Sequence, residues 1–268
     1  MGVVQSNAVR QAAACAAAAG LGCHVVSITG RVEAPGPEYF DTGNALLTRL
    51  FGAVIHTAGS DEERDEVAAR VAGDLRAAGR TPFVFPYGIS SVTGALGYVA
   101  ASEEIAQQAA ALPPFDVLVH ASGSAGTQAG LAVGCARHLP GTAIVGVDVD
   151  AAADRVRAEV AALAAAVAER IGDPFPDAAS IEVLAGHAGA AYGSAPGATL
   201  EAISLFARTE GLLLDPVYTG TAAAGLIAMV RSGRLTAGDR VLFVHTGGSP
   251  ALHAYRRPIA AHLGEGTP

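Results

Sequence analysis

Short apolar runs alternate with longer amphipathic segments along most of the chain. Segment 151–172 carries apolar residues at helical spacing, and segment 61–79 has acidic residues early and arginines late, an order that suits the helix dipole. Alternation of strand-like and helical segments predicts α/β architecture built on parallel sheets. The strand-like runs are 23–28, 53–57, 82–86, 117–120, 143–149, 181–184 and 241–245.

The first residues look like the middle of an α/β unit. Ser6 and Asn7 are typical of a helix N-cap, an alanine-rich helix is expected to about Gly20, and an apolar strand follows from about Cys23. The pattern leaves open which strand leads into this first helix.

Composition limits the class of protein. The chain has 268 residues, 51% hydrophobic residues and a formal net charge of -8, which is enough apolar sequence for one large or two small cores. The acidic balance argues against nucleic-acid binding. No run of 18 apolar residues predicts a membrane span, and no signal-like start is present, so we expect a cytoplasmic protein. Three cysteines without metal-like spacing suggest reduced, buried thiols.

A stretch rich in small residues, 88–97, suggests a crossing between two domains. We therefore predict a smaller α/β domain over 1–97 and a larger one over 98–268.

The strongest chemical signal lies at 117–138. A predicted strand ends in the small-residue turn 122–126, and Thr127 opens a predicted helix. Backbone N–H groups of such a turn, together with the helix N-terminus, can bind an anion, and Ser122 and Ser124 add hydroxyl donors. The turn has neither a P-loop lysine nor a G-x-G-x-x-G pattern, so a nucleotide is not favoured. The alternative is an ordinary tight turn between a strand and a helix.

Two further polar turns follow apolar runs. Asp215–Pro216 precedes Tyr218, Thr219 and a predicted helix, and His245–Gly248 precedes Pro250 and another. Ligands of open α/β sheets bind at the carboxyl ends of strands, so the three turns could line one pocket. Each residue alone is more simply explained as part of a turn. His245 and His253 lack a nearby acidic partner, so no metal site is predicted.

Five segments, in order, give the chain a family resemblance. They are 5–23, 94–105, 121–134, 191–220 and 241–255, and they resemble the D-cysteine desulfhydrase and 1-aminocyclopropane-1-carboxylate deaminase family. These are pyridoxal-phosphate (PLP) enzymes with the two-domain, parallel-sheet, tryptophan synthase β-like fold (fold type II). The deaminase branch has a glutamate after the tyrosine and an aliphatic residue before the glycine pair. Thr219 and Thr246 stand at those positions, so the chain resembles the desulfhydrase branch.

The resemblance implies roles for particular residues. Asn7 would contact the oxygen on the cofactor ring, Thr219 would face the pyridine nitrogen, and Thr246 would help to select the substrate. A neutral hydroxyl at the pyridine nitrogen would weaken the electron sink relative to a carboxylate. Near the substrate the resemblance places Ser6, Tyr192 and Tyr218, and around the cofactor phosphate it places Ser122, Gly123, Ser124, Ala125, Gly126 and Thr127.

Some positions depart from the family pattern. Ala8 replaces a larger polar residue, Thr221 replaces a common lysine, and Ala125 replaces a glycine in the phosphate loop, which is tolerable if its φ is negative. These departures leave the exact substrate open.

The chain contains no lysine, because all 17 of its basic residues are arginine. In the family that it resembles, a lysine upstream of the Ser–Asn helix binds the cofactor covalently. Since Met1 lies only a few residues before Ser6, we expect the lysine region to lie before this start, through a misassigned start codon or a gene fragment.

The function implied by the resemblance is a PLP-dependent C–S lyase that converts D-cysteine, or a similar small amino acid, to pyruvate, ammonia and sulfide. The alternatives are a lysine-less pseudo-enzyme that binds PLP or an amino acid non-covalently or pairs with another subunit, a 1-aminocyclopropane-1-carboxylate deaminase, and an unrelated α/β binding protein. The resemblance also implies a homodimer.

Overall fold

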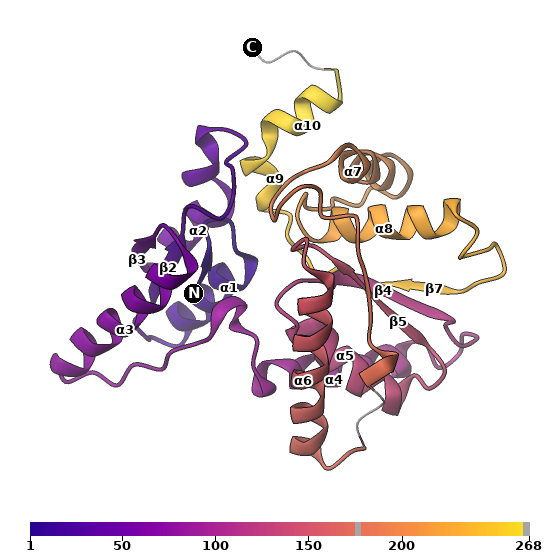
Figure 1. Cartoon of the computed structure of the whole chain (residues 1–268), viewed down its shortest axis with the longest axis horizontal. Helices are drawn as coiled ribbons and strands as arrows, with labels where there is room; N and C mark the ends of the chain where they lie inside the picture. The colour runs from indigo at the N-terminus through magenta and orange to yellow at the C-terminus, as the bar shows by residue number, and fades with distance from the viewer. Residues whose placement is uncertain (175–177, 265–268) are drawn as a thin grey trace. The chain divides into compact units, whose positions relative to one another are not determined.

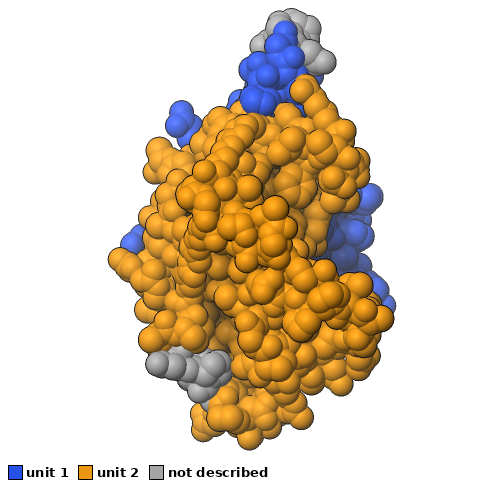
Figure 2. Space-filling model, turned by 90° about the vertical axis from the view of Figure 1, so that its right-hand side faces the viewer, with its two compact units in different colours: residues 1–89, 248–268 blue, residues 90–247 orange. Residues whose placement is uncertain are grey.

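The computed structural model describes residues 1–174 and 178–264. Contacts divide the chain into two compact units, coloured separately in Figure 2: Met1–Ile89 with Gly248–Pro268 as unit 1, and Ser90–Gly247 as unit 2. The predicted domains, 1–97 and 98–268, differ from these units in the assignment of 90–97 and 248–268. The division into domains 1–97 and 98–268 stays a prediction.

Unit 1 contains a parallel sheet of three strands in the order β1-β2-β3. The short β1 leads directly into the first helix and pairs with β2, so it is the strand that the sequence pattern left open. The strands are β1 (Gly2–Val3), β2 (His24–Ile28) and β3 (Val54–Ala58); the helices are α1 (Asn7–Ala18), η1 (Pro37–Phe40), α2 (Gly43–Leu50), α3 (Asp61–Ala77), η2 (Tyr87–Ile89), α9 (Ala251–Ala254) and α10 (Arg256–His262).

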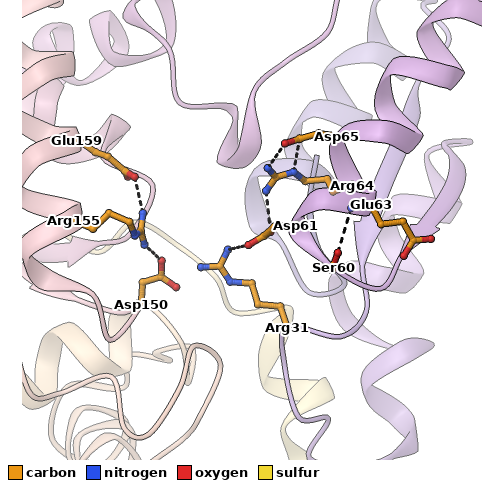
Figure 3. Close-up of polar contacts among 9 residues, drawn as sticks. All are labelled: Arg31, Ser60, Asp61, Glu63, Arg64, Asp65, Asp150, Arg155 and Glu159. Atoms are coloured by element: carbon orange, nitrogen blue, oxygen red, sulfur yellow. Dashed lines mark hydrogen bonds and ion pairs between the residues drawn. The ribbon is translucent and has the colours of Figure 1, made fainter.

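Helix α3 packs on this sheet and has a well-capped start. Val67 of α3 is buried against Val26 of β2 and Ala58 of β3. The hydroxyl of Ser60 accepts a hydrogen bond from the Glu63 N–H at 3.2 Å (Figure 3). The cap fixes where the helix begins, because it satisfies a backbone donor that the helix itself leaves free.

Unit 2 contains a parallel sheet of four strands in the order β6-β5-β4-β7. Parallel pairing in both sheets confirms the predicted α/β architecture. The strands are β4 (Val117–Ser122), β5 (Ala143–Asp148), β6 (Glu182–Leu184) and β7 (Val241–Phe243); the helices are α4 (Val92–Gln108), α5 (Gly126–His138), α6 (Ala153–Ile171), η3 (Ala178–Ser180), α7 (Gly197–Glu210) and α8 (Thr219–Arg231).

Helices cover both faces of the unit 2 sheet. Alternate residues of β4 point to opposite faces: Val119 packs in a cluster with Met229 of α8, and Leu118 packs with Leu131 of α5. Figure 1 shows α7 and α8 on one side of the strands and α4, α5 and α6 on the other. The sheet is therefore buried on both faces, as parallel sheets require. At the start of α6, Arg155 pairs with Asp150 and Glu159 (Figure 3).

The predicted strand at 82–86 was wrong, because this segment forms neither strand nor helix. Pro82 and Pro86 bound it, and proline cannot donate to a strand ladder. Phe83 is 79% exposed, so the apolar run does not report a buried strand here. Residues 212–214, the apolar run before Asp215, also form no strand. Within the residues that the structure describes, no helix combines the length and apolar character needed to cross a membrane.

Helices α4 and α5 approach each other closely through glycine. A β-carbon added at Gly130 of α5 would lie 2.2 Å from the carbonyl oxygen of Ala95 in α4. At Gly97 of α4, an added β-carbon would meet no atom within 4 Å. The contact at Gly130 matters for the site, because α5 begins at the predicted anion-binding turn.

We expect Gly130→Ala to lower the free energy of unfolding by roughly 1–3 kcal/mol, since backbone of α4 must move to admit the methyl group. The matched change Gly97→Ala should raise it by up to about 1 kcal/mol, because alanine is the better helix former. Urea unfolding of both variants measures the two effects. Equal behaviour of the two variants would contradict the close packing at Gly130.

Candidate functional site

The three predicted polar turns lie in unit 2 apart from Gly248, which belongs to unit 1, and two of them follow neighbouring parallel strands. β4 pairs with β7, so the turn after Ser122 and the turn after Phe243 leave the same edge of the sheet. The segment that leads into the remaining turn, at Asp215, is bonded to the turn after β7 through His245. The Nδ1 of His245 accepts from the Gly247 N–H at 3.1 Å. Its Nε2 therefore donates to the carbonyl of Leu213 at 3.0 Å. The structure thus brings together the segments that the sequence placed at strand ends.

The turn after β4 presents backbone donors at the start of α5. Ala125, at the N-cap of α5, makes no side-chain cap. Among the described residues, no acceptor is found for the backbone N–H groups of Ser124, Ala125, Thr127 and Gln128. Free N–H groups at a helix N-terminus, reinforced by the helix dipole, are the donor set that a phosphate requires. We call residues 122–127 with these donors the anion cradle.

Ala125 is the strained centre of the anion cradle. Its φ is 67° and its ψ is -30°, and the Gly126 N–H donates to the Ser124 carbonyl at 2.9 Å, which makes a γ-turn. The condition under which alanine would be tolerated here without strain, a negative φ, is therefore not met. Such a conformation costs a residue that carries a β-carbon of order 1–3 kcal/mol.

Close packing requires small residues in the anion cradle. A β-carbon on Gly123 would come within 3.0 Å of Val149, and one on Gly126 within 3.0 Å of the Ser90 hydroxyl. Ser90 donates a hydrogen bond to the Ser124 hydroxyl at 2.9 Å, which leaves the Ser124 proton free for another acceptor. Sequence reasoning missed Ser90, although its place just before a helix start could have suggested a second polar approach. The donor set fits a phosphate group.

Two tyrosines adjoin the anion cradle. The hydroxyls of Tyr192 and Tyr218 lie 2.5 Å apart, and the Cε1 of Tyr218 would lie 3.9 Å from a β-carbon on Gly123. Both rings are half-buried and meet edge to face, with centroids 6.3 Å apart. Hydrogen-bonded phenols at this distance can pass a proton between them. The pair therefore offers acid–base chemistry beside a phosphate-binding turn.

Thr219 is placed differently from what its predicted role suggests. It is 0% exposed; its hydroxyl donates to the Asp215 carboxylate at 2.9 Å and accepts from the Asp215 N–H at 2.8 Å. The proton of the Thr219 hydroxyl is thus used within the chain, and contact with the pyridine nitrogen stays a prediction. Thr246 follows β7 and is partly exposed, and no partner for its hydroxyl is found among the described residues.

Ser6 and Asn7 lie in unit 1, at the start of α1. The Ser6 hydroxyl caps the helix by accepting from the Val9 N–H at 3.2 Å, as predicted. The Asn7 side-chain oxygen accepts from the amide of the buried Asn44 at 2.6 Å. Because Asn44 donates to the side-chain oxygen of Asn7, the NH₂ group of Asn7 points to other acceptors. An oxygen on the cofactor ring would be such an acceptor.

Asn44 was missed by the sequence reasoning, as was Gln5, whose side-chain oxygen accepts from the Asn44 N–H at 2.9 Å. An asparagine in the first turn of a helix gives no signal of this role in the sequence.

Three buried polar atoms, on β4 and in the first turn of α5, have no partner among the described residues. They are His120 Nε2, Ser122 Oγ and Gln128 Oε1. His120 Nδ1 lies 2.8 Å from the Ala121 carbonyl, so Nδ1 carries the proton. Burial lowers the pKa of His120 to about 4, so the imidazole is neutral at physiological pH. Elsewhere, no three His, Cys, Asp or Glu side chains of the described residues gather as a metal site would need.

A doubly covered parallel sheet, with an open helix start and phenols at its carboxyl edge, is the arrangement of an α/β enzyme that holds a phosphorylated ligand. The family of pyridoxal-phosphate dependent enzymes matches residues 1–247. The chain belongs to this family, and PLP is the cofactor of the family.

Similar proteins agree with this assignment. The chain is 42% identical over 260 residues to D-cysteine desulfhydrase of Yersinia pestis (strain Pestoides F), covering 96% of this chain and 78% of that protein. It is 41% identical over 254 residues to the Salmonella schwarzengrund (strain CVM19633) enzyme of the same name, covering 95% and 76%. The crystal structure of an ACC deaminase homologue superposes with a TM-score of 0.86 at 31% identity, over 97% of this chain and 76% of that one.

A more distant crystal structure, that of a threonine deaminase, shares the fold with a TM-score of 0.62 at 18% identity, over 92% of this chain and 76% of that chain. The family resemblance and the tryptophan synthase β-like fold predicted from the sequence are confirmed.

We expect Ala125→Gly to raise the free energy of unfolding by roughly 1 kcal/mol, because glycine relieves the positive φ by more than it loses in chain entropy. Ala125→Val should lower it. The control Ala100→Gly, at an exposed position inside α4, should cost about 1 kcal/mol. Chemical unfolding measures all three, and a loss of stability in Ala125→Gly would contradict the strained turn.

Stability should fall as the pH drops through the range set by His120. Its folded pKa of about 4 lies below the ordinary 6.5, so the unfolded chain binds the proton more readily below pH 6.5. His120 should therefore remove about 2 kcal/mol of unfolding free energy between pH 7 and pH 5. Urea unfolding at both values measures it. His120→Gln should flatten this slope, whereas Ala100→Gly, which removes no titratable group, should keep it.

Proposed function

We propose that this protein is a PLP-dependent C–S lyase of the D-cysteine desulfhydrase type. The observation that carries the proposal is the anion cradle, whose free N–H groups lie beside the Tyr192–Tyr218 pair. Relatives named D-cysteine desulfhydrase, 42% identical over 96% of the chain, support this activity. Thr219 and Thr246 support the desulfhydrase branch over the deaminase branch. The predicted homodimer and cytoplasmic location stay predictions.

The anion cradle would bind the phosphate of PLP. The N–H groups of Thr127 and Gln128 would donate to its oxygens, with the hydroxyls of Ser124 and Thr127 as further donors. In unit 1, the NH₂ group of Asn7 would donate to the oxygen on the cofactor ring, held in that orientation by Asn44. When bound, PLP draws electrons from the α-carbon of the amino acid, which makes its proton removable.

The tyrosine pair would move protons in this reaction. The overall change is D-cysteine plus water to pyruvate, ammonia and hydrogen sulfide, so a proton leaves the α-carbon and the departing sulfur needs one. The hydroxyl of Tyr218 would give or take a proton, and Tyr192, 2.5 Å away, would accept or replace it. Ser6, whose hydroxyl accepts from Val9, keeps its own proton available as a donor towards the substrate.

The absence of lysine limits how these residues can bind the cofactor. The 268 residues contain 17 basic residues, all arginine, so no side chain among them can bind the PLP aldehyde as a lysine would. We propose that the lysine used in the lyase reaction comes from outside residues 1–268. The composition favours one second candidate, a lysine-free protein that binds PLP or an amino acid reversibly.

Binding of PLP to the 268-residue chain should depend on the phosphate. We expect PLP to bind more tightly than pyridoxal, and the Ser124→Ala/Thr127→Ala variant to weaken PLP binding about tenfold or more while leaving pyridoxal binding nearly unchanged. The control Thr142→Ala removes a hydroxyl that bonds the Phe115 carbonyl instead. Fluorescence titration gives the dissociation constants. Equal affinity for PLP and pyridoxal would contradict phosphate binding by the anion cradle.

Turnover separates the two candidate functions. The protein purified from its own cells should release sulfide and pyruvate in equal amounts from D-cysteine, faster than from L-cysteine, and should release no ammonia from 1-aminocyclopropane-1-carboxylate. Borohydride should add no mass to a side chain within residues 1–268, because these residues hold no lysine. Reversible PLP binding without sulfide release would favour the second candidate.

A further inference from the structure

The carboxylate of Asp215 is fully buried and satisfied by the segment that follows it. Its Oδ2 accepts from the N–H groups of Val217 and Tyr218, each at 2.9 Å. Its Oδ1 accepts from the Thr219 N–H at 2.8 Å and from the Thr219 hydroxyl at 2.9 Å. One side chain that is 0% exposed thus binds three successive backbone donors.

The main chain of Asp215 completes the arrangement. Its carbonyl accepts from the Gly220 N–H at 2.8 Å, and Pro216 has no N–H to satisfy. All the backbone donors from 217 to 220 are therefore bound by one residue. The first two donors of α8 are therefore bound within the described part of the chain, whereas in α5 the N–H groups of Thr127 and Gln128 are not.

Tyr218 lies in the middle of these bonds. Its own N–H and those of the residues on either side are held by the Asp215 carboxylate, so the peptide planes around Tyr218 are fixed. Its ring extends to the Tyr192 hydroxyl, 2.5 Å away, and beside Gly123 of the anion cradle. A change in the peptide planes at 217–219 would move the phenol oxygen, because the side chain is carried by that backbone.

We propose that Asp215 is a positioning residue that sets the hydrogen bond between Tyr218 and Tyr192. Its relevance to catalysis rests on the proposed function, whereas the hydrogen bond itself can be measured without cofactor. An ordinary helix cap elsewhere in unit 2 binds no backbone donor of residues 217–219.

Asp148 provides that comparison. It is also buried, and its carboxylate also accepts two backbone N–H groups, from Asp150 at 2.8 Å and from Ala152 at 2.7 Å. It stands before α6 instead of α8. Loss of Asp148 and loss of Asp215 therefore remove the same kind of bond, and only one of them supports Tyr218.

The test measures the coupling between the two tyrosines by NMR of the chain labelled with ¹³Cζ-tyrosine. The six tyrosines are assigned by single changes to phenylalanine. In the wild type, Tyr192→Phe should shift the Tyr218 signal, because it removes the partner hydroxyl. In Asp215→Asn the same change should leave the Tyr218 signal in place, whereas in Asp148→Asn the shift should persist.

A second variant keeps the test decisive if Asp215→Asn does not fold. Asp215→Ser retains a capping hydroxyl, which stabilises the helix start, but it cannot bind three donors. A persistent shift in folded Asp215→Asn or Asp215→Ser overturns the proposal, as does its loss in Asp148→Asn. Failure of the proposed function would appear differently, as a wild type that retains the coupling but neither binds PLP nor releases sulfide.

Discussion

The backbone N–H groups at the starts of helices control how this molecule is arranged around its site. Ser6, Ser60 and Ser91 each satisfy one such donor with a hydroxyl, and Asp215 satisfies the Thr219 and Gly220 donors that open α8. Helix α5 has no side-chain cap, and the N–H groups of Thr127 and Gln128 in its first turn find no acceptor among the described residues. A buried N–H group without an acceptor costs free energy. An anion bound at the start of α5 would remove this cost by accepting from these N–H groups.

The same constraint explains why strain is tolerated at Ala125. A γ-turn with a φ of 67° lets the chain leave β4 and enter α5 within a few residues. Close packing of Gly130 against α4 fixes the helix behind the turn, and Tyr218 lies against Gly123 on the other side. The anion cradle is therefore set by packing on both sides before any ligand arrives, which is how a binding site avoids an ordering cost.

Much of the fold followed from patterns that act locally. Apolar runs predicted β2, β4 and β5, since buried parallel strands need little more than apolar side chains. Segment 82–86 has a similar apolar composition, but the strand predicted there was wrong. Its two prolines cannot donate hydrogen bonds to a neighbouring strand, and its side chains face solvent. The two-residue strand β1 was too short for any periodicity to show, and it exists because β2 offers it a partner.

The site was predictable as far as its residues interact with neighbours in sequence. The Ser6 cap and the turn at 122–127 follow from such spacing, whereas Asn44 and Ser90 act on residues more than thirty positions away. Asp215 shows that prediction from sequence is limited even within one segment. It was predicted as part of a turn, but its hydrogen bonds to residues 217–219 were not predicted. Whether a carboxylate before a helix binds three donors depends on peptide orientations that Pro216 and Gly220 set together. The predicted position of Thr219 at the pyridine nitrogen depends on the same local network, because its hydroxyl donates to the Asp215 carboxylate.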